Sequence, residues 1–236
     1  MSIIQALFFD GDDTLWKMQD AYDEAKLLFS RLLNSIGIPD RNVIHELDAL
    51  DAQRVAVRGF TNERFLESML ILYAQLSTKY GLPWQTQVEK EIQNISLLLY
   101  RPPELFEDTL STLNSLEGKF QLYLYSAGNP RVQKTKINHL KLLKYFKKVY
   151  IVNRKNEDIL QRIIRKEALS PERAWIIGNS LRSDIIPAIG IGLNAIYIPR
   201  GDWKYDEEAK GVDGENRYYT VNTLSEAASI IIKSKK

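Results

Sequence analysis

The chain has 236 residues and a formal net charge of only +2, because 30 Asp and Glu residues nearly balance 32 Lys and Arg residues. That balance argues against a dedicated nucleic-acid-binding protein. The chain contains no cysteine, which excludes disulfides, thiolate zinc sites and a cysteine nucleophile. With only two histidines, catalysis must rest mainly on carboxylates, hydroxyls, amides, Lys and Arg, and such groups favour hard metal ions with oxygen ligands.

The first residues do not resemble a secretory signal, because residues 2–9 lack a cationic lead and run directly into Asp10. The longest apolar stretch, residues 185–199, is shorter than the roughly 20 residues that a membrane helix needs, and Pro187 and two glycines interrupt it. We therefore expect a cytoplasmic protein without a membrane span.

Short apolar runs alternate with helical patterns through most of the chain, which predicts an α/β fold with a doubly wound parallel sheet. The runs that we interpret as buried strands span residues 3–9, 120–125, 149–152 and 174–177. Helical patterns between them cover residues 105–116, 132–146 and 159–169. Further on, we expect edge strands at residues 194–198 and 218–221 and a closing helix at residues 225–233.

Residues 19–100 break this alternation, since they contain helical patterns and almost no strand signal. Glycine-containing bends at residues 37–39, 59–61 and 81–83 divide the region into four expected helices. Two prolines then follow Arg101, and paired prolines disfavour a continuous helix. We therefore predict an α/β catalytic core formed by residues 1–18 and 101–236, with an all-helical cap formed by residues 19–100.

The segment 131–150 carries seven cations and no acid, a composition that could attract anionic ligands or nucleic acid. Four of the cations fall near one helical face: Lys134, Lys141, Lys144 and Lys148. Because apolar residues between them can face the core, we prefer to interpret this segment as a helix with a solvated basic face.

Polar residues follow each of the four predicted buried strands. The first strand is followed by Asp10, Asp12 and Thr14, and the second by Ser126, Gly128 and Asn129. The third is followed by Lys155, and the fourth by Asn179 and Asp184. Since the carboxyl ends of parallel strands share one edge of an open sheet, we expect these four groups to converge where ligands bind.

This set of residues resembles the motifs of the haloacid dehalogenase superfamily, and within it the magnesium-dependent phosphatases with a helical cap of the C1 type. The segment Asp10-Gly11-Asp12-Asp13-Thr14 matches the first motif, Asp-x-Asp-x-Thr. Ser126 fits the second motif, Lys155 the third, and Asn179 with Asp184 the fourth. The resemblance covers essentially the whole chain.

The resemblance implies hydrolysis of a small phosphomonoester through an aspartyl-phosphate intermediate. Asp10 would be the nucleophile and Asp12 the general acid and base, with Thr14 orienting Asp12. Ser126 would donate a hydrogen bond to a phosphoryl oxygen, and Lys155 would supply positive charge. Mg²⁺ would be held by groups from the first and fourth motifs: Asp10, Asp12 through its backbone carbonyl, Asp184 and Asn179. We also expect Thr14, Gly128 and Asn129 to contribute to substrate binding.

Two positions depart from the family pattern. The fourth motif often has Asp where this chain has Asn179, so one negative charge near the metal is missing. Lys155 is followed by Asn156 where Pro is more usual, and Arg154 is an adjacent cation that could substitute for Lys155.

The cap is expected to select the substrate, because the core would contact only the phosphoryl group and the leaving oxygen. Arg58 and Phe60, at a glycine-containing bend between cap helices, are candidate substrate contacts, although Arg58 could equally be a solvated helix-end cation. Trp16 and Trp203 are further candidates that could either line the mouth of the site or simply pack.

Several alternatives remain open at this point. A phosphomutase would need the same pair of aspartates. A 2-haloacid dehalogenase also uses an aspartate nucleophile, but Asp12 and Asp184 argue against it, because halide displacement needs neither an acid for an alkoxide nor magnesium. An inactive binding or regulatory module with this fold is the alternative from another class. The sequence leaves the substrate and the oligomeric state undetermined.

Overall fold

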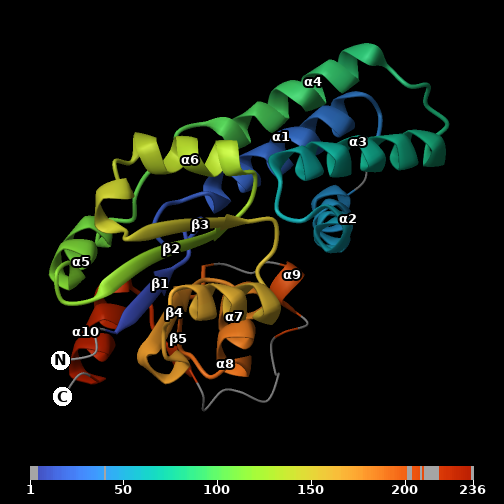
Figure 1. Ribbon diagram of the computed structural model, residues 1–236. Helices are drawn as coiled ribbons and strands as arrows, with labels where there is room; N and C mark the ends of the chain where they lie inside the picture. The colour runs from blue at the N-terminus through green and yellow to red at the C-terminus, as the bar shows by residue number, and fades with distance from the viewer. Residues whose placement is uncertain (1–4, 40, 201–203, 208, 210–217, 235–236) are drawn as a thin grey trace. The chain divides into compact units, whose positions relative to one another are not determined.

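The computed structural model describes residues 5–39, 41–200, 204–207, 209 and 218–234. They include a six-stranded sheet with the order β3-β2-β1-β4-β5-β6, in which all neighbouring strands are parallel (Figure 1). The strands are β1 (Ala6–Phe9), β2 (Gln121–Ala127), β3 (Lys148–Val152), β4 (Ala174–Gly178), β5 (Asn194–Tyr197) and β6 (Tyr218–Thr220). The predicted α/β fold with a parallel sheet is therefore confirmed.

The chain divides into two compact units, Met1–Lys17 with Pro103–Lys236, and Met18–Pro102. In the part of the first unit that the structure describes, the sheet is accompanied by six α-helices: α5 (Thr109–Leu116), α6 (Pro130–His139), α7 (Glu157–Lys166), α8 (Ile186–Gly190), α9 (Lys204–Glu207) and α10 (Leu224–Ser234). The second unit is all-helical and is inserted between β1 and β2. None of the described helices is both long enough and apolar enough to cross a bilayer.

Alternation of apolar side chains along the strands builds the core of the α/β unit. Phe8 of β1 stacks on Tyr123 of β2 with ring centroids 4.7 Å apart, and both belong to a buried cluster with residues of α7 and α8. Since successive side chains of a strand point to opposite faces, Leu7 and Phe9 face the other side, and both are fully buried. The sheet is thus covered on both faces, as parallel sheets generally are.

The helix predicted over residues 132–146 is wrong in its second half. It ends at His139, and Lys141 adopts a left-handed backbone with φ of 54°. A single 3₁₀ turn follows at Leu143–Tyr145. A left-handed residue cannot continue an α-helix, so the basic segment is a short helix and a turn rather than one long face.

The helical unit contains α1 (Gln19–Ser35), α2 (Val43–Arg58), α3 (Asn62–Lys79), α4 (Thr86–Ser96) and a 3₁₀ turn at Leu97–Tyr100. Its core is apolar and aromatic, with Phe29, Phe65 and Tyr73 fully buried. One buried ion pair crosses it: Arg64 donates to both carboxylate oxygens of Asp51 at 2.8 and 2.9 Å.

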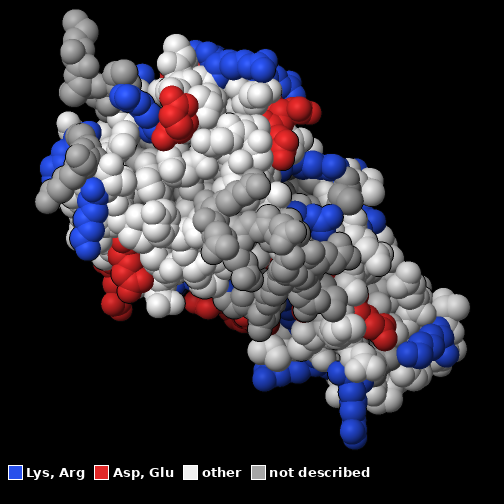
Figure 2. Space-filling view, turned by 90° about the horizontal axis from the view of Figure 1, so that it is seen from below, with Lys and Arg blue, Asp and Glu red and all other residues white. Residues whose placement is uncertain are grey.

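On the face shown in Figure 2, charged side chains of both signs are distributed rather than concentrated. Figure 2 shows Lys and Arg side chains interspersed with Asp and Glu on the face that it presents. This distribution agrees with the small net charge of the whole chain.

Candidate active site

The site is built where the chain order of the strands reverses. The central strand β1 lies between β2 and β4, so the chain leaves it first to one side and later to the other. Asp10 directly follows β1, and its backbone N–H donates to the carbonyl of Ile177 in β4 at 2.9 Å. Ligands of open α/β sheets bind at this kind of switch point, beyond the carboxyl ends of the strands.

Lys155 joins two buried carboxylates at that edge. Its ammonium contacts Asp10 Oδ1 and lies 2.6 Å from Asp184 Oδ1. All three side chains are at least nine-tenths buried. The structure therefore brings together the residues predicted from the first, third and fourth motifs, and it is Lys155 rather than Arg154 that makes these contacts.

The electrostatics of this cluster are unbalanced, because two carboxylates share one ammonium. Burial raises the pKa of Asp10 to about 7, even though Lys155 opposes the shift, and the charge of Asp184 adds to it. Burial likewise raises the pKa of Asp184 against the opposing effect of Lys155. Burial alone would lower the pKa of Lys155, but the two carboxylates outweigh it and raise that pKa. The cluster carries surplus negative charge whenever both acids are ionised.

Local structure fixes the orientation of Lys155 and Asp184. Asn156 is the N-cap of α7, because its side chain accepts the backbone N–H of Ile159 at 2.9 Å, and this explains why the departure from Pro is accommodated after Lys155. Asp184 Oδ2 accepts the backbone N–H of Ser180 at 3.1 Å. Each reactive side chain is thus anchored through a neighbouring turn.

Thr14 contacts Asp10, whereas the sequence pattern predicted that it would orient Asp12. Its hydroxyl is fully buried and donates to Asp10 Oδ2 at 3.1 Å. The Asn179 amide faces the same oxygen and the backbone carbonyl of Asp12, each at 3.3 Å. Because both are acceptors, we place the amide nitrogen of Asn179 towards them. Asn179 is thus a donor to Asp10 in this arrangement.

Asp12 is held by three donors, two of which sequence reasoning missed. Its Oδ1 accepts from the indole nitrogen of Trp16 and from Lys136 Nζ at 2.8 Å. Its Oδ2 accepts from Gln133 Nε2 at 2.9 Å. Trp16 is fully buried and therefore packs under Asp12.

The spacing of Gln133 and Lys136 in the sequence could have indicated that both side chains face inward. They lie three residues apart on α6 and precede the buried Ile137, so they belong to the inward face of that helix. The lysines that the sequence places on one basic face, Lys134, Lys141, Lys144 and Lys148, are exposed, whereas Lys136 is buried.

Ser126 lies near the carboxyl end of β2, which extends to Ala127, and its hydroxyl accepts from Gln133 Nε2 at 3.0 Å. The two residues predicted to bind substrate here have structural contacts. Gly128 donates its N–H to the carbonyl of Val152 at 2.9 Å. Asn129 is the N-cap of α6 and accepts the N–H of Arg131 at 2.9 Å.

A match to a known protein family shows to which family this chain belongs. The model of haloacid dehalogenase-like hydrolases matches residues 4–192, which is most of the chain. The chain is a haloacid dehalogenase-like hydrolase. The predicted family and the prediction that the protein is an enzyme are both confirmed.

Known relatives of this hydrolase include phosphatases. A glyceraldehyde 3-phosphate phosphatase of Methanothermobacter thermautotrophicus is 27% identical over 208 residues, which cover 83% of this chain and 86% of that protein. A haloacid dehalogenase-like hydrolase of Xanthomonas campestris has a similar structure, with a TM-score of 0.81, 25% identity, and coverage of 98% and 96% of the two chains. A putative hydrolase of the superfamily from Bacillus subtilis, bound to magnesium, shares the fold at 18% identity with a TM-score of 0.64 and 97% and 98% coverage.

The donor set of the hydrolase fits a divalent cation. Among the described residues no group of three or more His, Cys, Asp and Glu side chains is arranged to hold a metal ion. The resemblance, however, requires only two carboxylates, Asp10 and Asp184, together with the backbone carbonyl of Asp12. Burial raises the pKa of both Asp10 and Asp184, which means that it disfavours their negative charge, and a hard cation beside them would neutralise that charge.

The cap residues predicted to bind substrate have partners within the helical unit. Arg58 Nη2 lies 2.5 Å from Glu67 Oε1, and Arg54 contacts the same carboxylate. The ring of Phe60 lies beneath the Arg64 guanidinium, whose carbon is 6.0 Å from the ring centroid. The remaining candidate, Trp203, lies outside the described residues.

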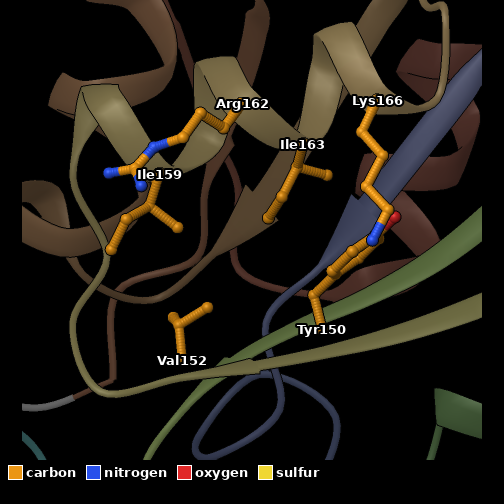
Figure 3. A pocket seen from close by; sticks show the side chains of 6 residues that line it. All are labelled: Tyr150, Val152, Ile159, Arg162, Ile163 and Lys166. Carbon is orange, nitrogen blue, oxygen red and sulfur yellow. The ribbon is translucent and has the colours of Figure 1, made fainter.

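A hollow of about 190 Å³ lies elsewhere in the α/β unit, between β3 and α7 (Figure 3). Its lining is apolar apart from two cations and a phenol: Tyr150, Val152, Ile159, Arg162, Ile163 and Lys166. None of the predicted site residues lines it. The reactive groups thus lie at the sheet edge and not in this hollow.

Proposed function

We propose that the protein is a Mg²⁺-dependent phosphatase that hydrolyses a small phosphomonoester through an aspartyl-phosphate on Asp10. The observation that carries the proposal is the convergence of Asp10, Lys155 and Asp184 at the sheet edge, with a second carboxylate, Asp12, two residues from the nucleophile. The phosphatase relative supports the same reaction class.

In the first step a carboxylate oxygen of Asp10 forms a bond to phosphorus. The bond between phosphorus and the ester oxygen breaks, and its electron pair stays on the leaving oxygen, which takes a proton from Asp12. Ser126 and Lys155 would provide a hydrogen-bond donor and a positive charge to the phosphoryl oxygens as charge is redistributed over them. The products are the free alcohol and the phosphorylated Asp10.

In the second step Asp12, now ionised, accepts a proton from a water molecule that attacks phosphorus. The bond between phosphorus and the Asp10 oxygen breaks, inorganic phosphate is released, and both aspartates return to their initial states. One residue thus serves as acid and then as base.

Mg²⁺ would be held by Asp10, Asp184, the backbone carbonyl of Asp12 and the Asn179 position, and it would supply charge neutralisation between the phosphate and Asp10. In the arrangement described above, Asn179 is a donor to Asp10, so it would contribute to metal binding through a water molecule or after turning its amide.

For the substrate, we infer a small phosphorylated metabolite of the size of a triose phosphate, in keeping with the relative that acts on glyceraldehyde 3-phosphate. The cap residues Arg58 and Phe60 are our proposed contacts for the leaving group. An anionic substrate would have to compete with Glu67 for Arg58.

The test is release of inorganic phosphate from glyceraldehyde 3-phosphate, glycerol 3-phosphate and 4-nitrophenyl phosphate, with Mg²⁺ and with excess EDTA. We expect release that depends on magnesium and that Asp10→Asn abolishes. Acid-quenched wild-type protein should gain the mass of one phosphoryl group. Transfer of phosphate to a second position of the substrate without release would support a phosphomutase, and halide release from 2-chloropropionate would support a dehalogenase.

A further inference from the structure

One buried face of α6 is directed at Asp12 and Ser126. Gln133 and Lys136 are 2% and 5% exposed, although long polar side chains are rarely buried without a partner. Their partners are the Asp12 carboxylate, which follows β1, and the Ser126 hydroxyl, near the end of β2. The helix therefore connects two of the family motifs through side chains that belong to neither.

Lys136 and Trp16 act on the same oxygen of Asp12, and Gln133 acts on the other. With donors on both oxygens, the carboxylate cannot turn about its last torsion without losing a charge-assisted hydrogen bond. The side chain of Asp12 nonetheless remains 34% exposed, so one side of it stays accessible to a ligand. This combination is what a proton-transfer group requires, because its direction is fixed while its reacting edge is open.

Gln133 has a second effect, on Ser126. Its amide nitrogen has two hydrogens and faces three acceptors: Asp12 Oδ2, Ser126 Oγ and the carbonyl of Ala127, at 2.9, 3.0 and 2.7 Å. Because Ser126 Oγ accepts from Gln133, its own hydrogen is directed away from the amide and is available to another acceptor. The Gln133 carbonyl oxygen is buried and has no hydrogen-bond partner among the described residues, whose contacts hold this side chain through its nitrogen.

We propose that Gln133 and Lys136 are positioning residues: Lys136 directs the Asp12 carboxyl group for proton transfer to the leaving oxygen, and Gln133 directs both Asp12 and the Ser126 hydroxyl. The inference rests on the proposed phosphatase function and extends it to residues of α6. The inference predicts different effects for the two residues, because only Gln133 contacts Ser126, whose hydroxyl would bind a phosphoryl oxygen.

The test uses a series of phosphomonoesters that differ in the basicity of the leaving group, with kcat/KM as the readout because it reports formation of the phosphoenzyme. An alkoxide needs a proton as it leaves, whereas 4-nitrophenolate does not. For Lys136→Met we expect kcat/KM to fall about tenfold or more with an alkyl phosphate and less than about threefold with 4-nitrophenyl phosphate. The larger loss would be part of the rate enhancement of about 10²–10⁴-fold that general acid catalysis contributes.

Gln133→Met is the second variant, and we expect its kinetics to differ from those of Lys136→Met. It should lower kcat/KM for 4-nitrophenyl phosphate as well, because Ser126 loses its orientation, and it should raise KM across the series. Lys134→Met is the matched control, since it removes one lysine from the exposed side of the same helix. We expect wild-type kinetics from this control.

An equal loss of kcat/KM for every leaving group in Lys136→Met, at an unchanged melting temperature, would refute the inference, because an effect on proton transfer must depend on the leaving group. If Lys136→Met does not fold, Gln133→Met decides: a loss of kcat/KM across the series would support the inference, and wild-type kinetics in that variant would refute it. Failure of the underlying function looks different: wild-type protein would release no phosphate, or Asp10→Asn would not impair the release.

Discussion

A methyl group on Gly178 would lie 2.3 Å from the carboxylate of Asp184. Gly178 ends β4, and Asp184 lies on the turn of π-helix that follows, Leu181–Ile185, so the strand and the acidic side chain touch where no Cβ can fit. The glycine therefore determines how closely Asp184 can approach Lys155.

The first prediction follows from that contact. Gly178→Ala should displace the Asp184 carboxylate and weaken Mg²⁺ binding, and overpacking of this kind costs about 1–3 kcal/mol of stability. Isothermal titration with Mg²⁺ and thermal unfolding would measure the two effects. Gly190→Ala is the control, because there the added methyl meets only the end of the Glu157 side chain. Unchanged magnesium affinity in Gly178→Ala would contradict the prediction.

The second prediction concerns pH and stability without metal. Burial raises the pKa of Asp10 and of Asp184 in the folded protein, so the fold binds these protons more tightly than the unfolded chain. The associated stability is present below pH 4 and is lost as pH rises through about 7.

Asp184→Asn should remove much of this dependence, because the amide leaves Lys155 with one carboxylate. In EDTA we expect the variant to exceed wild type in unfolding free energy at pH 8, by roughly 1–3 kcal/mol, and to lose this advantage at pH 4. Denaturant titrations at the two pH values measure the difference. A constant difference between the proteins at both pH values would argue against the surplus charge.

The third prediction addresses Asn179. Its amide nitrogen faces Asp10, so Asn179→Asp replaces a donor with an anion 3.3 Å from another carboxylate oxygen. We expect the metal-free variant to melt at a lower temperature than wild type and to bind Mg²⁺ more tightly. The magnesium-induced rise in melting temperature should therefore be larger than in wild type, whereas an equal rise would remove Asn179 from the metal site.

The fourth prediction tests the cap. Arg58→Ala should lower kcat/KM for an anionic metabolite and leave 4-nitrophenyl phosphate almost unaffected, because only the leaving group would meet Arg58. Glu67→Gln should act in the opposite direction, since it frees Arg58 from its carboxylate partner. Equal kinetics of both variants on a panel of physiological phosphates would exclude Arg58 from substrate binding.

The sequence predicted the sheet well because its signals are local. Apolar runs bounded by polar residues lie within a residue or two of β2, β3 and β4, and the polar groups after them converge as parallel topology requires. The orientation of single side chains could not be predicted even within one motif, because nothing near Thr14 indicates that its hydroxyl meets Asp10 rather than Asp12. Contacts between segments distant in sequence were not predicted either. The burial of Lys136 likewise depends on a carboxylate 124 residues earlier in the chain.

The position of β1 has a consequence for how the protein matures during synthesis. Ala6 pairs with Gln121 on one side and with Ala174 on the other, so both neighbours of the nucleophile strand are made more than a hundred residues after it. The helical unit is contiguous in sequence, and the contacts within it need no later segment. Chains dominated by local contacts fold faster than those that await distant pairings. A nascent chain would therefore complete its helical unit first, and Asp10 would meet Lys155, which follows β3, only after β3 had been made.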